Sequence, residues 1–332
     1  MAAASLLTEV IISKYENHLP LYRQSKIFMR QGIDIPANTL GNWVMQSGKI
    51  LKPLAEALRN EIKNINVLQA DETPVTVLKK RGKGYMWCYH SCLPENRFVI
   101  FDYSSTRGSI AVNAVLKDYQ GILQTDGYQG YNEIHAKENV ISLGCWAHCR
   151  RKFAEIVKIG ITGKAAEAIE YIKKLYKYEK QAHEEKLTFA KRKELRQKKA
   201  KPIIDEFKIW LEKTLPCAPP NSALGKAIKY ALSQWKHLSE YIDHGEAEID
   251  NNWAENKIRP FTLGRKNWMF IGNENAANIA ALLYSLIQTC KMHDINARKY
   301  FIYVLNQAKK LSLGTIDPKT LLPQFIDKTL LK

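Results

Sequence analysis

Runs of strand-forming residues gather in one part of the chain, between residues 66 and 145, and helical patterns fill most of the rest. Valine, isoleucine and aromatic residues favour strands, and two segments of helical spacing interrupt these runs. In chain order the block predicts three strands, a helix, a strand, a short helical piece and a strand. The first expected strand is the apolar run 66–71, which ends on Asp71 and which β-branched residues continue over 73–78. The other expected strands cover residues 85–92, 97–103, 121–126 and 139–145, and the expected helix covers residues 109–119. This order predicts an α/β fold.

Residues 4–64 carry apolar side chains at helical spacing. One helix is expected from Leu21 to Gln31, with Gly32 as its C-terminal cap, and another from Pro36 to about Ser47. Two short helices joined by a tight turn predict a helix-turn-helix that reads DNA; a plain helical bundle is the alternative. The expected buried stripe of the second helix is Leu40, Trp43 and Val44. The expected DNA-facing residues are Asn38, Thr39, Asn42 and Gln46.

Helical patterns return after the strand-rich block. Within them, Lys186 to Lys201 is dense in lysine and arginine, which is more typical of a solvated helix face than of a binding site. The segment Asp250 to Arg259 predicts a short helix that Asp250 caps and Pro260 ends. The expected division is a helical module (1–64), a first part of the core (65–149), a helical insertion (150–245), a second part of the core (246–310) and a tail (311–332).

The chain is strongly basic, with 50 Lys and Arg against 33 Asp and Glu, a net charge of 50 − 33 = +17. Such a surplus favours solubility, and it also suits a polyanionic partner, because phosphate neutralisation supplies much of the affinity for nucleic acid. The longest apolar stretch, residues 279–287, is far shorter than the roughly 20 residues of a membrane span. The N-terminus lacks the basic region of a signal peptide. We therefore expect a cytoplasmic protein with reduced thiols and no membrane partner.

Two carboxylates, Asp71 and Asp126, follow two separate apolar runs, so we expect them to meet at neighbouring strand ends. Hard cations such as Mg²⁺ prefer carboxylates, and a third one would complete a two-ion site. Glu255 is the leading candidate, since Arg259 lies four residues on and shares its helix face. Spacing alone leaves rivals open: Asp102 at another strand end, and Glu246, Glu248 and Asp250 in place of Glu255. Glu72 adjoins Asp71, but neighbours in a strand point to opposite faces, so these two are not expected to share one site.

Longer motifs narrow this choice. The sequence contains Ala70-Asp-Glu-Thr-Pro74, Thr125-Asp-Gly-Tyr-Gln-Gly-Tyr131, Gly144-Cys-Trp-Ala-His-Cys-Arg-Arg-Lys-Phe153, Asp250-Asn-Asn-Trp-Ala-Glu-Asn-Lys-Ile-Arg-Pro260 and Gly264-Arg-Lys-Asn267. Nearer the N-terminus are His18-Leu-Pro-Leu-Tyr-Arg-Gln24 and Thr39-Leu-Gly-Asn-Trp43. In this order, over nearly the whole chain, these motifs resemble the IS66 family of insertion-sequence transposases.

The resemblance implies a DDE transposase that cleaves DNA strands and transfers them. It implies an RNase H-like core, a mixed five-stranded sheet with helices, interrupted by the helical insertion. Asp71, Asp126 and Glu255 would be the catalytic, metal-binding residues, holding two Mg²⁺ ions that Mn²⁺ can replace. Arg259, Arg265 and Lys266 would contact phosphate; an exposed turn is the alternative for the last two.

The resemblance also implies partners. These are the element's terminal inverted repeats, target DNA, further copies of the chain and accessory proteins, in a bacterial cytoplasm at the nucleoid. Members usually carry an N-terminal zinc-binding region, which this chain is expected to lack. A truncated remnant that binds transposon ends as a regulator, without cutting, is therefore an alternative, and a stand-alone nuclease is a third.

Four residues beyond the fifth expected strand are further candidates for DNA contact: Trp146, His148, Arg150 and Arg151. Trp146 could stack on an unpaired base or be buried, and His148 could touch phosphate or be structural. The cysteines at 88, 92, 145 and 149 lie near histidines, but their spacing differs from that of a zinc knuckle. Buried free thiols are the favoured interpretation.

Overall fold

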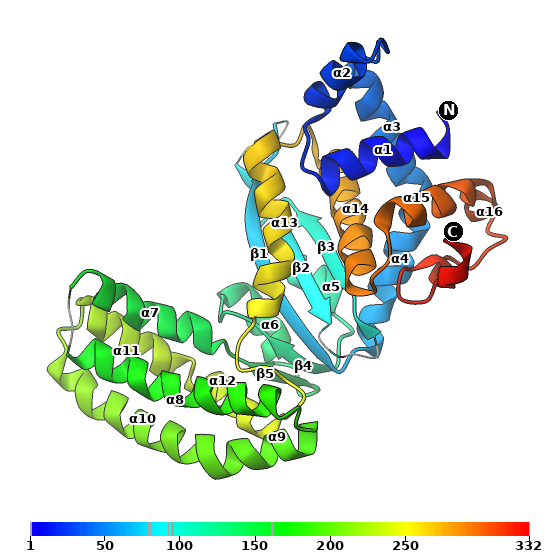
Figure 1. Ribbon diagram of the computed structural model, residues 1–332. Helices are drawn as coiled ribbons and strands as arrows, with labels where there is room; N and C mark the ends of the chain where they lie inside the picture. The colour runs from blue at the N-terminus through cyan, green and yellow to red at the C-terminus, as the bar shows by residue number, and fades with distance from the viewer. Residues whose placement is uncertain (1, 79–81, 92, 94–95, 161–162, 332) are drawn as a thin grey trace. The chain divides into compact units, whose positions relative to one another are not determined.

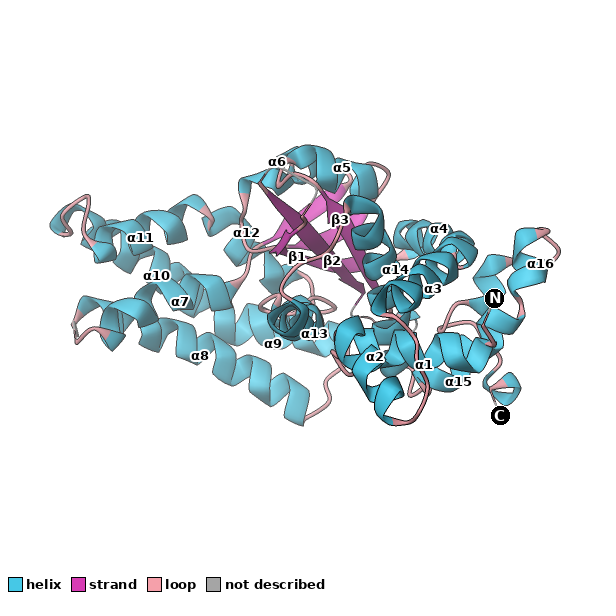
Figure 2. Ribbon diagram, turned by 90° about the horizontal axis from the view of Figure 1, so that it is seen from above, coloured by secondary structure: helices cyan, strands magenta, loops and turns pink. Residues whose placement is uncertain are grey.

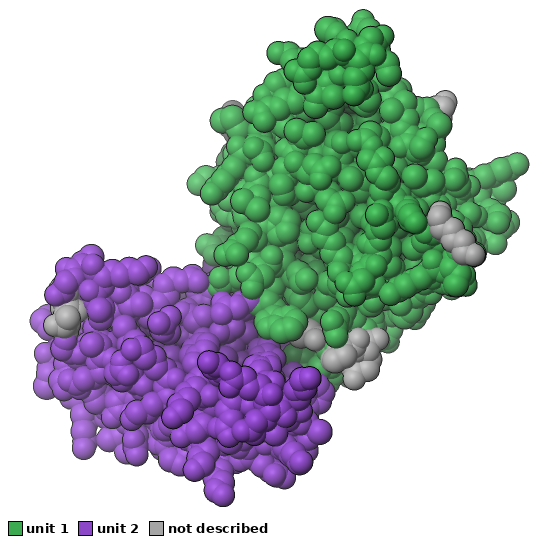
Figure 3. All heavy atoms as spheres, viewed as in Figure 1, with its two compact units in different colours: residues 1–120, 253–332 green, residues 121–252 purple. Residues whose placement is uncertain are grey.

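The computed structural model describes residues 2–78, 82–91, 93, 96–160 and 163–331. It divides into two compact units, coloured separately in Figure 3. The first unit holds residues 1–120 and 253–332, and the second holds residues 121–252. The five segments expected from the sequence are a different division, and they stay a prediction.

The five strands form a mixed sheet, which confirms the expected α/β class. In the first unit, β1 (Val67–Thr76), β2 (Lys83–Ser91) and β3 (Val99–Ser104) are antiparallel. In the second unit, β4 (Gly121–Gln124) and β5 (Val140–Leu143) are parallel. Asp71 does not end a strand, contrary to expectation. It lies in the middle of β1, because Thr73, Val75 and Thr76 continue the pairing with β2.

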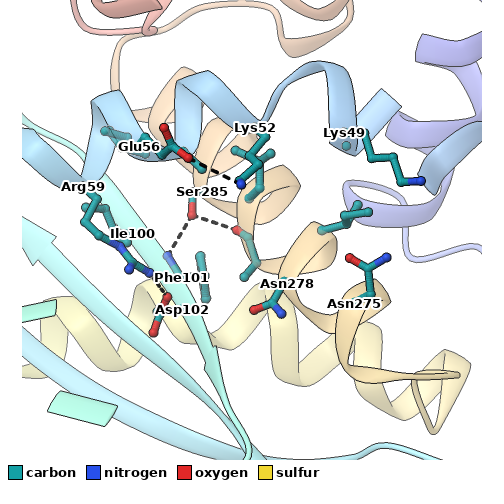
Figure 4. A pocket seen from close by; sticks show the side chains of 16 residues that line it. Lys49, Lys52, Glu56, Arg59, Ile100, Phe101, Asp102, Asn275, Asn278 and Ser285 are labelled. Atoms are coloured by element: carbon teal, nitrogen blue, oxygen red, sulfur yellow. Dashed lines mark hydrogen bonds and ion pairs between the residues drawn. The ribbon is translucent and has the colours of Figure 1, made fainter. Parts of the chain in front are cut away.

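The edge strand β3 is protected by helix α14 (Glu274–Met292). Ser285 Oγ accepts a hydrogen bond of 2.8 Å from the backbone N–H of Phe101, and Thr289 Oγ1 accepts one of 3.1 Å from Val99 (the first is drawn in Figure 4). Unpaired edge groups invite pairing with other chains. Two hydroxyl side chains of α14 therefore satisfy donors that the open edge would otherwise expose.

Four α-helices precede the sheet in the described part of the chain: α1 (Ala4–Tyr15), α2 (Leu21–Arg30), α3 (Ala37–Ile50) and α4 (Lys52–Asn60). The helical N-terminal region is thus as expected, but the link between α2 and α3 covers residues 31–36, longer than the three or four residues usual in a helix-turn-helix. Leu40 and Val44 are buried, whereas Trp43 is only half-buried, so the expected buried stripe is narrower.

Gly48 marks a close approach of α3 to α14, which Figures 1 and 2 show side by side. A Cβ at Gly48 would lie 2.4 Å from Cγ2 and 2.7 Å from Cγ1 of the buried Ile279. Overpacking of this kind costs about 1–3 kcal/mol, and alanine's better helix propensity offsets up to about 1 kcal/mol of it.

We therefore expect Gly48→Ala to lower the free energy of unfolding by about 0.5–2 kcal/mol, measured by urea denaturation. Gly272→Ala is the matched control, because a Cβ there meets no atom within 4 Å and its φ is not in the left-handed region. Equal stability of the two variants would contradict the tight α3–α14 contact.

Helices fill the chain between β5 and the helix that carries Glu255, as the insertion prediction requires. They are α7 (Trp146–Lys158), α8 (Lys164–Glu184), α9 (Phe189–Leu195), α10 (Lys201–Thr214), α11 (Ala223–Ser233) and α12 (Trp235–Glu240). The basic stretch Lys186 to Lys201 is not wholly a solvated face. Arg192 and Arg196 within it are buried against acidic side chains of the same unit.

Helix α13 (Asn252–Trp268) runs through Pro260, so the expectation that Pro260 ends it is wrong. A proline inside a helix removes one hydrogen bond. Here the buried stripe of Ala254, Ile258, Phe261 and Gly264 holds the helix on both sides of that break. Asp250 does cap it, since its Oδ1 accepts a 3.1 Å hydrogen bond from the N–H of Asn252.

The remaining helices are α5 (Ser109–Leu116), α6 (Asn132–His135), α15 (Ala297–Asn306) and α16 (Ala308–Ser312). No helix in the described part of the chain is both long and apolar enough to cross a lipid bilayer.

Candidate active site

Asp71 is half-buried on the face of β1 that it shares with Gln69 and Thr73, because side chains two apart in a strand point the same way. Its partner across the ladder is Cys88 on β2. The neighbouring Glu72 points to the opposite face, as expected, and there Arg107 Nε donates a 2.9 Å hydrogen bond to its carboxylate. Glu72 is therefore not a rival ligand at this face.

Helix α13 lies across this same face of β1 (Figure 1). At its start, the backbone N–H of Ala254 donates a 3.1 Å hydrogen bond to Gln69 Oε1. Near its end, Arg265 Nη1 donates one of 2.9 Å to Thr73 Oγ1. Asp71 lies between these two attachment points, and Glu255 follows Ala254 in the first turn. The first turn of α13, which carries Glu255, is thus attached to the face of β1 that carries Asp71.

A ring contact with β2 also fixes the start of α13. The ring of Trp253 meets the edge of His90 at 6.1 Å between centroids, and His90 is the ladder partner of Gln69. His90 is fully buried, and burial lowers its pKa to about 3, so its ring is neutral at physiological pH. A neutral, buried imidazole packs against Trp253 without bringing a charge to the site.

Lys257 is a cation of this site that sequence reasoning missed. Burial raises the pKa of the Cys88 thiol well above its usual value, the Asp71 carboxylate raises it further, and the Lys257 ammonium opposes both. Both charged groups therefore act on one thiol at the face that α13 covers. The available signal was position, because Lys257 lies two residues after Glu255 on the same short motif.

Asp126 belongs to the second unit, two residues after β4 ends. Its Oδ1 accepts a 2.9 Å hydrogen bond from the N–H of Tyr128, and its backbone carbonyl accepts one of 2.8 Å from Tyr230 Oη. Gly127, which follows Asp126 in the sequence, has φ +82°, and a Cβ on it would lie 2.7 Å from Gln234 Oε1. Asp126 is thus held in a tight turn, and the joint action of Asp71, Asp126 and Glu255 stays a prediction.

The other residues of α13 that are expected to contact phosphate differ in their exposure and their hydrogen bonds. Arg259 and Lys266 are exposed, as a phosphate contact requires. Arg265 instead donates to Thr73 and to the backbone carbonyl of Pro74, and burial lowers its pKa. Neither Arg265 nor Lys266 lies in an exposed turn, because α13 extends to Trp268. Phosphate contact by the three remains a prediction.

The candidate DNA-facing residues of α3 lie largely at its surface. Asn38, Asn42 and Gln46 are exposed, and Thr39 is half-buried. This arrangement fits both a recognition helix and a solvated bundle face, so base contacts by these residues also stay a prediction.

In the second unit, Trp146 is fully buried and its Nε1 donates a 2.8 Å hydrogen bond to the carbonyl of Leu238. The suggestion that Trp146 stacks on an unpaired base is therefore corrected, because its ring has no exposed surface. Its apolar surroundings include Phe207, with ring centroids 6.2 Å apart. On the same helix Arg150 and Arg151 are exposed and His148 is half-buried.

The described cysteines form no disulfide and differ in burial. Cys88, Cys145, Cys149 and Cys290 are free and buried, as favoured, whereas Cys217 is exposed, and Cys92 lies outside the described residues. No group of three His, Cys, Asp or Glu side chains suited to a metal ion occurs among the residues that the structure describes. Because Cys92 is not among the described residues, a zinc site at Cys88, His90 and Cys92 stays untested.

Comparison with known proteins gives this arrangement a family. The chain matches the family described as "Transposase IS66 family" over residues 1–279. It is 32% identical over 311 residues to the uncharacterized protein y4qI of Sinorhizobium fredii, covering 88% of this chain and 57% of that protein. It is 31% identical over 338 residues to the uncharacterized protein y4jD of the same organism, covering 97% and 66%. The chain thus spans 57% and 66% of the length of these curated relatives. Because the family match includes β1, the turn after β4 and the start of α13, the chain belongs to the IS66 family of transposases.

Proposed function

We propose that this chain acts as a DDE-type DNA transposase, which cuts DNA at the ends of an insertion sequence and joins the freed ends to target DNA. One observation carries the proposal: α13 is attached to β1 on both sides of Asp71, with Glu255 in its first turn. An acidic pair on two rigid elements, beside the Lys257 cation, suits phosphodiester chemistry, in which anionic substrate and cations must share one site.

The donor set fits a hard divalent cation, because carboxylate oxygens are the ligands that Mg²⁺ prefers. Asp71, Asp126 and Glu255 would hold two Mg²⁺ ions, with Mn²⁺ as a substitute. When bound, the ions would supply Lewis-acid activation of the attacking oxygen and charge stabilisation of the leaving one. Hydrogen bonds hold β1 and α13, which carry Asp71 and Glu255, together within the first unit, and Asp126 would supply the third carboxylate.

The chain's own cations would bind the DNA. Lys257 lies at the face that holds Asp71, and Arg259 and Lys266 are exposed on the same helix. They would contact the phosphates that flank the scissile bond, while Arg265 would position β1 against α13. The net charge of +17 would offset the electrostatic repulsion between the DNA phosphates and these acidic residues. The partners would be terminal repeats and target DNA, with further copies of the chain and accessory proteins.

The test is strand cleavage in vitro. The purified chain is incubated with a supercoiled plasmid that carries the element's terminal repeats, in Mg²⁺, Mn²⁺ or EDTA. We expect nicks that map to the repeat ends and carry 3′-hydroxyls, in either metal but not in EDTA. Binding of the repeats without cleavage in any divalent metal would overturn the proposal and favour the alternative of a regulatory remnant.

A further inference from the structure

A cavity of about 530 Å³ lies in the first unit, apart from Asp71 and Glu255. It is bounded by α1, α3 and the segment that joins α13 to α14, residues 269–273. Aromatic rings of Tyr15, Trp268 and Phe270 line it, together with the polar side chains of Lys14, Asn38 and Asn42. We call it the α1–α3 cavity. Its volume falls in the range of roughly 300–1,000 Å³ that small ligands occupy.

Lys14 is the unusual group of this cavity. Its Nζ lies 5.5 Å from the ring centroid of Tyr15 and 5.9 Å from that of Trp268. Among the described residues, none of the ion pairs within 4.0 Å includes Lys14, and burial lowers its pKa to about 8. Lys14 is half-buried, and a cation partly removed from water without an anion is costly. An anionic group bound beside Lys14 would remove that cost.

A second cavity of the first unit differs from the α1–α3 cavity in the ion pairs of its cations. It measures about 440 Å³ and is drawn in Figure 4. There Lys52 pairs with Glu56 at 3.7 Å, and Arg59 pairs with Asp102. Lys52 and Arg59 thus have carboxylate partners from the chain itself, and the third cation lining this cavity, Lys49, is exposed to solvent. Lys14 in the α1–α3 cavity instead lies half-buried beside two aromatic rings, with no carboxylate within 4.0 Å among the described residues.

The other side chains that line the α1–α3 cavity indicate which groups the ligand carries besides its anion. Phe270 is 48% exposed, and the preceding Met269 has φ +62°, a left-handed conformation that residues with a side chain rarely adopt. Asn38 and Asn42 are exposed, and their side-chain amides hydrogen-bond to no other described residue. Aromatic faces stack on nucleobases, and asparagine amides match base edges. An aromatic, hydrogen-bonding group that carries a negative charge describes a nucleotide.

We propose that the α1–α3 cavity binds one nucleotide unit, with its base against Trp268 and Phe270 and its phosphate against Lys14. The inference rests on the proposed function, since DNA would supply that nucleotide as one displaced from the duplex. Unpaired or frayed nucleotides cost least to displace, which makes them the expected ligands. A free mononucleotide shares the same chemistry and is the other source to distinguish.

The test measures binding by the full chain in EDTA, so that no cleavage step is involved. Two duplexes of one sequence are compared, one fully paired and one with a single unpaired 2-aminopurine. We expect the second to bind about tenfold more tightly and its fluorescence to fall on stacking. Lys14→Gln and Phe270→Ala should each abolish most of that preference, and Lys14→Arg should retain it. Lys49→Gln and Phe325→Ala, exposed elsewhere in the first unit, should leave it unchanged.

The outcomes separate the possibilities. Equal binding of both duplexes, or a preference that survives Lys14→Gln and Phe270→Ala, would overturn the inference. Binding of 2-aminopurine deoxynucleoside monophosphate without any preference between the duplexes would overturn DNA as the source of the nucleotide. Because the assay needs no catalysis, a preserved preference with no strand cleavage would contradict only the proposed function. Urea denaturation of each variant identifies loss of binding that comes from unfolding.

Discussion

Replacing Glu255 by glutamine should lower Mg²⁺-dependent strand cleavage by roughly 10³-fold while leaving the fold and DNA binding in EDTA intact. The substitution keeps the size of the side chain and removes its charge. Metal-assisted stabilisation of a transition state contributes several kcal/mol, and each 1.4 kcal/mol corresponds to about tenfold in rate. Cleavage is measured as nicks at the element's ends under single-turnover conditions.

Glu56→Gln is the matched control for this prediction. Glu56 lies on α4 in the same unit, is largely exposed and pairs only with Lys52, at 3.7 Å, among the described residues. An exposed pair of this kind contributes little to stability, so the control should cleave like the unaltered chain. If Glu255→Gln cleaved as well as Glu56→Gln, the assignment of Glu255 would be wrong.

A double variant sharpens this result. If Asp71 and Glu255 serve one site, Asp71→Asn should cost about as much as Glu255→Gln, and the combination should cost little more than either alone. Groups that act as a unit behave in this non-additive way. Two independent structural defects would instead add their effects. Multiplied losses in the double variant would therefore contradict a shared site at the face of β1 covered by α13.

The sequence was a good guide to the elements of the fold, because strand and helix propensities are local. The positions of the five strands and the helical insertion follow from such local patterns. The details that failed depend on partners distant in sequence. Asp71 lies within a long strand because β2 pairs beyond it, and α13 passes Pro260 because its apolar side is packed on both sides of that residue.

The candidate site shows the same limit. Motif resemblance selected Asp71, Asp126 and Glu255 from 33 acidic residues, and spacing alone could not. The roles of Gln69 and Thr73 as attachment points for α13 are missing from any local pattern, since their partners lie about 190 residues away. The choice between a stacked and a buried Trp146 stayed open for the same reason, because the helices that bury it come later in the chain.

The clearest failure concerns Arg192 and Arg196, which composition assigned to a solvated face. They are four residues apart, so they share one helix side, and their common partner Glu179 lies on α8. Burial raises the pKa of Glu179, but the two guanidinium groups outweigh it and hold that pKa below its usual value. The signal available in the sequence was the use of arginine among lysines, since arginine suits buried ion pairs better.

Arg196 satisfies every donor that a guanidinium group has. Its Nε and Nη2 each donate 2.8 Å hydrogen bonds to the Glu179 carboxylate. The carbonyls of Ala247, Tyr241 and His244 accept three more, of 2.8, 2.9 and 2.6 Å. The guanidinium also stacks over the Tyr241 ring, with 4.8 Å from Cζ to the centroid. One side chain that is 1% exposed thus holds residues 241–247 against α8.

Arg196→Met should therefore lower the stability of the second unit by about 3–5 kcal/mol, because it leaves a buried carboxylate short of a partner and three carbonyls unpaired. The stability of the Arg196→Lys variant should lie between that of Arg196→Met and that of the unaltered chain. The three donors of a rotating ammonium group cannot replace the five fixed donors of a guanidinium group. Urea unfolding gives the magnitude, and hydrogen exchange should show the loss at residues 241–247. Lys193→Met, three residues away and half-exposed, should change stability by less than about 0.5 kcal/mol. If the Arg196 and Lys193 variants were equally stable, the buried cluster would not be what keeps residues 241–247 in place.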